Sequence, residues 1–183
     1  MPQAVITYGG PGIARHDPDF MPGYVVNHIL GGGSFTSRLY REVREKRGLA
    51  YGVSEGLYWF RRAAVMLGGT ATRADRTADA LKVIEEQIKL MADQGPTAAE
   101  LAAAKSYLKG AYALSLDTST KIAAQLTEIQ LDNLGIDYIQ RRSGLIDAVT
   151  LDDAKRVAKR LYGDGLLVTI AGRPKGLTST SAD

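Results

Sequence analysis

Three consecutive glycines, Gly31 to Gly33, separate an apolar segment from a strongly charged one and constrain what this chain can fold into. A glycine run is costly inside a helix or strand, because glycine loses more backbone entropy on folding than other residues do. The chain is therefore expected to turn or to approach another backbone closely there. The preceding segment, Phe20 to Leu30, is expected to be a helix that the glycines terminate.

The charged segment Ser37 to Lys46 is predicted to be a second helix. Ser34 or Thr36 can accept hydrogen bonds from its first free amides as the N-cap. Leu39 and Val43 have the i, i+4 spacing of a buried stripe. The helix is therefore expected to pack one face against a core and to expose its charged residues.

Gly48 is placed to end this helix in a left-handed conformation, and the run from Leu49 to Tyr58 is rich in strand-forming residues. Arg44 then lies on the last helical turn and Tyr51 near the start of the strand, within reach of one ligand. A guanidinium fork and a phenol hydroxyl can together hold a carboxylate or a peptide carbonyl. The alternative is a solvated arginine beside a tyrosine that only packs.

The rest of the chain alternates between strand and helix patterns. Strands are predicted at Gln3–Tyr8, Leu49–Trp59, Ala63–Thr72 and Leu166–Ala171, the second and third as an antiparallel hairpin and the last as a buried strand. Helices are predicted at Asp75–Asp93, from Thr97 to about Leu116, at Ser119–Asn133 and at Leu151–Tyr162, with capping boxes at Thr97/Glu100 and Thr150/Asp153. These elements predict an α+β two-layer sandwich, a mainly antiparallel sheet with helices packed on one face. Residues 1–172 are expected to form a single domain and residues 173–183 a polar, mobile tail.

Composition excludes several classes of protein. The chain has 183 residues, a net charge of +3 and no cysteine, so a disulfide framework and thiol catalysis are excluded. No apolar stretch is long enough to span a bilayer. Basic and aromatic residues are not interleaved as in a nucleic-acid-binding strand face, so no nucleic-acid partner is expected.

The segment from Leu30 to Tyr51 resembles the non-catalytic domain of the pitrilysin or insulinase type of zinc metallopeptidases, which includes the mitochondrial processing peptidases. The matching residues are Leu30, Gly31 to Gly33, Ser37, Arg38, Leu39, Arg44, Glu45, Lys46, Arg47, Gly48, Leu49, Ala50 and Tyr51. The resemblance implies the same α+β fold. It also implies that Arg44 and Tyr51 contact a peptide substrate, and that a glycine-rich loop lets the peptide or a partner domain come close. The loop residues are Gly31, Gly32, Gly33 and Ser34.

The catalytic signature of that family, H-x-x-E-H, is absent, and the only histidines are His16 and His28. Alignment with the helix of the catalytic half places Tyr24 at the first zinc ligand and Asn27 at the glutamate. One histidine cannot hold a catalytic zinc, and an asparagine cannot take a proton. We therefore expect no catalytic residue and no metal or other cofactor in this chain, with zinc in the partner catalytic domain and His28 as an interior or interfacial histidine.

The resemblance implies that this chain is the substrate-binding, non-catalytic half of a bacterial zinc metalloendopeptidase. Its partners would be a peptide and a catalytic half, either fused to it or present as the other subunit of a heterodimer. The alternative is a non-proteolytic scaffold subunit of a larger complex. The intact pair of Arg44 and Tyr51 favours the first hypothesis, and the compartment stays open between bacterial cytoplasm and periplasm.

Overall fold

The computed structural model describes residues 3–177. The strands are β1 (Gln3–Pro11), β2 (Ala50–Trp59), β3 (Ala64–Arg73) and β4 (Leu167–Ala171). The helices are α1 (Phe20–Asn27), α2 (Thr77–Gln94), α3 (Ala98–Leu114), α4 (Ser119–Leu131), α5 (Tyr138–Asp147) and α6 (Leu151–Tyr162). Two π-helical turns, His28–Gly32 and Tyr40–Glu45, and two 3-10 turns, Ser34–Thr36 and Ala74–Arg76, complete the elements.

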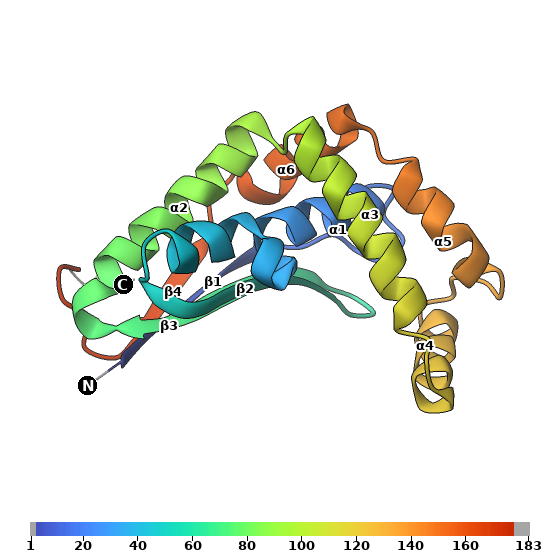
Figure 1. Cartoon of the computed structure of the whole chain (residues 1–183), viewed down its shortest axis with the longest axis horizontal. Coiled ribbons are helices and arrows are strands. Elements are labelled where there is room, and N and C mark those ends of the chain that lie inside the picture. Colours follow the sequence, from blue (N-terminus) through green and yellow to red (C-terminus); the bar gives the residue numbers. More distant parts are fainter. Residues whose placement is uncertain (1–2, 178–183) are drawn as a thin grey trace.

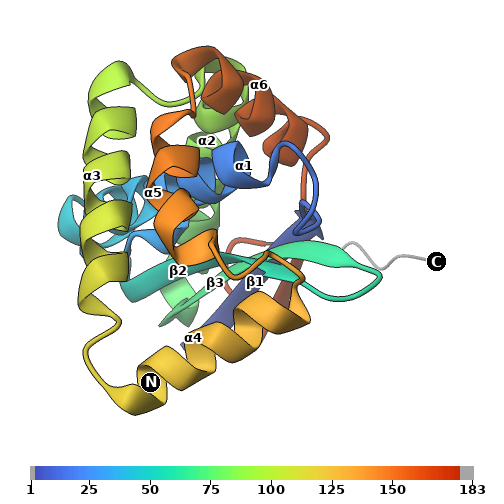
Figure 2. The ribbon, with the colours of Figure 1, turned by 90° about the vertical axis from the view of Figure 1, so that its right-hand side faces the viewer.

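The sheet has four strands in the order β2-β3-β1-β4, and every neighbouring pair is antiparallel. The helices form a layer over one face of this sheet, while α4 stands apart from the other helices (Figure 1, Figure 2). This architecture confirms the predicted α+β sandwich. It also places the start of β2, at the edge of the sheet, beside the π-helical turn that carries Arg44.

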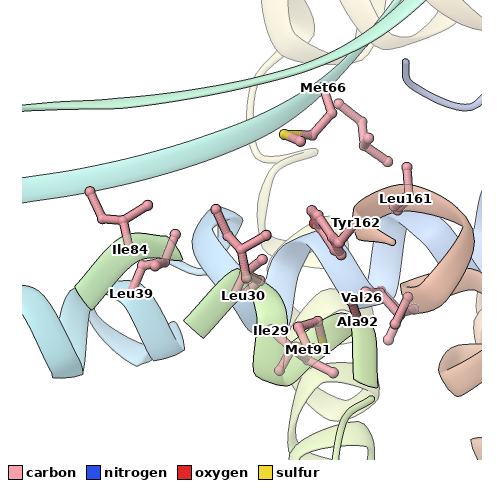
Figure 3. Packing of buried hydrophobic residues seen from close by; sticks show 14 of the residues in the cluster. Val26, Ile29, Leu30, Leu39, Met66, Ile84, Met91, Ala92, Leu161 and Tyr162 are labelled. Atoms are coloured by element: carbon pink, nitrogen blue, oxygen red, sulfur yellow. The ribbon is translucent and has the colours of Figure 1, made fainter. Parts of the chain in front are cut away.

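The core lies between the sheet and the helix layer, because strands and helices each present one apolar face to it. On β1 the buried residues Ala4, Ile6 and Tyr8 alternate with exposed ones. Figure 3 shows side chains of α1, α2 and α6 gathered beneath β3. The labelled residues are Val26, Ile29, Leu30, Leu39, Met66, Ile84, Met91, Ala92, Leu161 and Tyr162. The core therefore joins segments from most of the described chain.

The hairpin of β2 and β3 is confirmed, and its register shifts between Ala50 and Val53 where a bulge interrupts the ladder. The prediction that the last strand is buried is wrong. β4 pairs with β1 at the edge of the sheet, and its residues alternate between exposed and half-buried. An edge strand is covered on one side only, and the apolar run Leu166–Ala171 does not reveal this.

Two further features differ from the sequence predictions. Helix α5 was not predicted, although its residues Tyr138 and Ile146 are buried. The N-cap of the charged helix is Ser37, whose hydroxyl accepts from the Tyr40 amide at 3.3 Å, and not Ser34 or Thr36. The 3-10 turn Ser34–Thr36 lies before this cap and delays the start of the helix.

The capping predictions at α3 and α6 are confirmed, since both capping boxes are present with reciprocal hydrogen bonds. Of the predicted tail, residues 178–183 lie outside the described residues. Within its described part, the amide of Lys175 donates to the carbonyl of Ala74 at 2.9 Å. None of the helices formed by residues 3–177 is long and apolar enough to cross a membrane.

Candidate functional site

The last turn of the charged helix is joined tightly to β2. Gly48 has φ +57, the left-handed conformation predicted for it, and its amide donates to the carbonyl of Arg44 at 2.9 Å. The amide of Leu49 donates to the carbonyl of Val43 at 2.9 Å. These bonds use carbonyls that a helix end leaves without intrahelical partners. The chain therefore reverses within a few residues, and Tyr51 lies beside Arg44.

The guanidinium of Arg44 contacts two aromatic rings. Its central carbon lies 4.5 Å from the ring centroid of Tyr51 and 4.9 Å from that of Tyr40. The Nη1 atom of Arg44 also donates to the Tyr40 hydroxyl. The structure thus brings Arg44 and Tyr51 together as the sequence indicated. It adds Tyr40 as a third member that sequence reasoning did not single out, although its place four residues before Arg44 is a helical neighbour position.

Exposure differs sharply across this group. The Tyr51 side chain is 85% exposed, whereas that of Tyr40 is 7% exposed. A Cβ added at the neighbouring Gly52 would meet nothing within 4 Å. Stacking against Arg44 therefore fixes one side of the Tyr51 ring, while the space beside it is open to a ligand.

Arg44 also differs in charge pairing from the basic residues around it. Lys46 and Arg47 each lie 2.7 Å from the Glu42 carboxylate, and Arg38 lies 2.6 Å from Glu100. Within residues 3–177, Arg44 has no carboxylate partner closer than 4.0 Å. Its charge is balanced only by aromatic faces and one hydroxyl, which leaves donor capacity for an anionic or carbonyl ligand.

The glycine run makes the predicted close approach, but the prediction that it terminates the helix from Phe20 is wrong, because Gly31 and Gly32 belong to the π-helical turn His28–Gly32. A Cβ added at Gly31 would lie 2.5 Å from the Cβ of Glu55 on β2, and one at Gly33 would lie 2.7 Å from the carbonyl oxygen of His28. Ser34, the last residue of the predicted loop, is exposed and has φ +47. The approach seen here is therefore internal to the domain, and a role of the loop toward a peptide stays a prediction.

The three side chains that the resemblance pairs with the key positions of H-x-x-E-H lie in different surroundings. Tyr24 is half-buried and stacks on Phe20 at 6.2 Å. Asn27 is 5% exposed, and its Nδ2 donates to Glu55 Oε1 at 2.8 Å. His28 stacks on Tyr107 of α3, with ring centroids 4.9 Å apart. In the part of the chain that the structure describes, no group of three or more histidine, cysteine or acidic side chains could hold a metal ion.

Glu55 is the center of a buried polar cluster that sequence reasoning missed. Its Oε1 accepts from Asn27 and from the Tyr162 hydroxyl. Among the described residues, its Oε2 and the hydroxyl of Tyr8 have no hydrogen-bond partner. Burial raises the pKa of Glu55 to about 7. The alternation of Val53, Glu55 and Leu57 along β2 was an available signal, because it puts this glutamate on the apolar face.

A glycine makes this cluster possible. Glu55 pairs with Gly68 on β3, and Gly68 pairs with Tyr8 on β1, so the three residues form one row across the sheet. A Cβ at Gly68 would lie 2.3 Å from the Tyr8 ring. The ring therefore lies over Gly68, in the space between β1 and Glu55.

Comparison with known proteins identifies the family. The family model described as the peptidase M16 inactive domain matches residues 1–108. A zinc protease of Streptomyces coelicolor, itself uncharacterized, is 31% identical over 173 residues, which are 93% of this chain and 37% of the relative. An uncharacterized zinc protease of Mycobacterium tuberculosis is 33% identical over 146 residues, 78% of this chain and 33% of the relative.

A solved structure agrees with this. The crystal structure of a peptidase M16 inactive domain from Pseudomonas fluorescens matches with a TM-score of 0.83 and 31% identity, over 92% of this chain and 40% of that one. The fold and the family match define an inactive domain of the zinc-peptidase type, as the resemblance around Leu30 to Tyr51 implied. This chain belongs to the peptidase M16 inactive-domain family. It spans only about a third of the length of its curated relatives, 37% and 33%.

Proposed function

We propose that this domain is the substrate-binding, non-catalytic half of a zinc peptidase, in which Arg44 and Tyr51 hold the peptide. The observation that carries the proposal is the environment of Arg44. Its guanidinium is positioned by two aromatic rings, lacks a carboxylate partner among residues 3–177, and lies beside a tyrosine that is 85% exposed. The arrangement suits a ligand that supplies the missing acceptor.

The acceptor in this proposal is a carbonyl oxygen or the terminal carboxylate of a peptide. Arg44 has five N–H donors, and Tyr40 takes one of them. The remaining fork donates to the peptide in one plane, and the Tyr51 hydroxyl adds one more bond. Because aromatic contacts hold the guanidinium in place, less side-chain entropy is lost when the peptide binds.

The chemistry of hydrolysis comes from a catalytic half, fused or separate, that carries the H-x-x-E-H helix. The zinc bound there would activate the attacking water. The role of this domain is to orient the peptide, which lowers the barrier only if the peptide is held at a distance from the metal that suits the attack. Loss of the grip should therefore reduce turnover and leave the zinc content of the assembled enzyme unchanged.

The test compares four variants of the assembled enzyme, this domain together with its catalytic half. Arg44→Lys keeps the charge and removes the fork, and Tyr51→Phe keeps the ring and removes the hydroxyl. Tyr58→Phe and Arg61→Ala are matched controls, since both residues are exposed and lie at the far end of β2 or just beyond it. The measurements are kcat/KM on a peptide substrate and bound zinc per assembly.

Arg44→Lys is expected to lower kcat/KM by about tenfold or more, since a hydrogen bond to a charged group contributes about 1.5–3 kcal/mol and 1.4 kcal/mol corresponds to tenfold. Tyr51→Phe is expected to lower it by a smaller factor, because the bond it removes is to a neutral donor. The two controls should stay within about twofold. If both site variants behave like the controls, the grip is refuted. If the assembled protein cleaves no peptide, the scaffold hypothesis replaces the proposal.

A further inference from the structure

A hollow of about 420 Å³ lies between the end of α1, the loop after the glycine run, and α3. We call it the His28–Tyr107 pocket. It is lined by His28, Ile29, Thr36, Arg41, Ala99, Glu100, Ala103, Ala104 and Tyr107. Its size is within the range of sites that take small ligands or side chains.

The lining is apolar and uncharged except at one end. Three alanines of α3 leave the space open, and the stacked rings of His28 and Tyr107 form an aromatic wall. Burial lowers the pKa of His28, so its imidazole is neutral near pH 7. The charged residues of the pocket, Arg41 and Glu100, lie 3.9 Å apart, and Glu100 is also paired with Arg38 at 2.6 Å. The wall formed by the rings and alanines carries no charge and therefore suits an apolar group.

Neighbouring residues and ring contacts connect the edge of the pocket to Arg44. Arg41, which lines the pocket, belongs to the same π-helical turn as Arg44. Thr36 follows Phe35, whose ring is 70% exposed and meets the Tyr40 ring edge-on at 5.0 Å. Tyr40 in turn accepts from Arg44. A row of contacts thus leads from the edge of the pocket to the guanidinium.

We propose that the His28–Tyr107 pocket receives a large apolar side chain, aliphatic or aromatic, of the peptide that Arg44 and Tyr51 hold. This inference rests on the proposed function, because it assigns the occupant from the neighbouring grip. It makes the pocket a specificity site, since an apolar pocket distinguishes large from small side chains by roughly tenfold or more in kcat/KM. It also gives His28 a role in the pocket wall.

The test fills the pocket without touching the grip. Ala103→Phe and Ala99→Phe each place a ring on an exposed lining position, and Ala102→Phe is the matched control, exposed on the same helix but outside the lining. The assembled enzyme is given a tryptic digest of denatured casein, and the cleavage products are quantified by mass spectrometry. The profile then shows which residues are preferred at each position around the cut bond. Thermal unfolding and gel filtration establish that each variant is folded and assembled.

The expected result is a loss, by about tenfold, of the preference for large apolar residues at one position of the profile in both pocket variants, and an unchanged profile for Ala102→Phe. An unchanged profile in the folded pocket variants overturns the proposal, as does an equal loss at every position. Failure of folded pocket variants to join the catalytic half also overturns it, because the partner domain would then be the occupant. Arg44→Lys tests the grip separately from the pocket. It should lower the rate of cleavage at all sites together, whether or not the pocket prefers apolar side chains.

Discussion

Replacing Glu55 by glutamine should change how the stability of this domain depends on pH. The side chain of Glu55 is buried on the inner face of β2, and burial raises its pKa from 4.5 to about 7. Between these values the folded protein keeps a proton that the unfolded chain has released. The free energy of unfolding therefore falls as pH rises from about 4.5 to about 7, and above pH 7 the loss is complete. Glutamine cannot ionise, so Glu55→Gln removes this slope.

The magnitude follows from the gap between the folded and unfolded pKa values, 4.5 to about 7. At about 1.4 kcal/mol per unit, ionisation of Glu55 costs about 3 kcal/mol of stability at pH 8. The cluster explains why this cost is not offset. Burial removes the carboxylate from water, and this outweighs the hydrogen bonds from Tyr162 and Asn27 that favour its charged form. The glutamine oxygen can accept the same two bonds.

The assay is urea unfolding of both proteins at several pH values from 4.5 to 8, with the difference between them plotted against pH. The difference isolates Glu55, because other groups cancel. His28 in particular has a lowered pKa, so its contribution to stability rises with pH, but it does so in both proteins and cancels in the difference. Glu55→Gln should gain about 3 kcal/mol relative to wild type between pH 4.5 and pH 8. A difference that stays flat across this range would refute an elevated pKa for Glu55.

Two further changes test neighbouring parts of the structure. Gly68→Ala should lower the free energy of unfolding, measured in urea, by about 1–3 kcal/mol, because the new Cβ meets the Tyr8 ring at 2.3 Å. Gly110→Ala is the control. A Cβ there meets nothing within 4 Å, so this change should be neutral or stabilising. Tyr40→Phe keeps the ring beside Arg44 and removes its hydrogen-bond acceptor. It should lower kcat/KM of the assembled enzyme by about threefold to tenfold at constant zinc content, and an unchanged kcat/KM would show that Tyr40 does not position Arg44.

The elements that the sequence predicts well are those with local signals. Capping boxes, the left-handed glycine at 48 and the apolar stripe of α2 each lie within a few residues of what they specify. Helix α5 was not predicted because a buried charged residue interrupts its apolar pattern. Arg142 is 7% exposed and lies on the inner face, where it donates to the carbonyl of Leu108 and contacts the Tyr112 ring at 4.1 Å. A cation on a buried face makes the helix look polar all round, and only the folded structure shows what pairs with it.

The same division applies to the candidate site. Arg44 and Tyr51 could be found because one helix end and one turn separate them, and Gly48 fixes that turn. The cluster at Glu55 could not be assembled from the sequence, since its partners Asn27 and Tyr162 are 28 and 107 residues away. Such contacts depend on strand order and helix packing, which no local sequence pattern predicts.

The position of Asn27 ties the absent catalytic signature to the packing of this domain. The family resemblance pairs Asn27 with the glutamate of H-x-x-E-H. Its side chain is 5% exposed and bonded to Glu55. A carboxylate at position 27 would face a second carboxylate in a buried space, where like charges cannot both ionise cheaply. Gly31 adds to this constraint, because a Cβ at that position would lie only 2.5 Å from the Glu55 Cβ. Asn27 therefore helps to hold β2, and with it Tyr51, against α1.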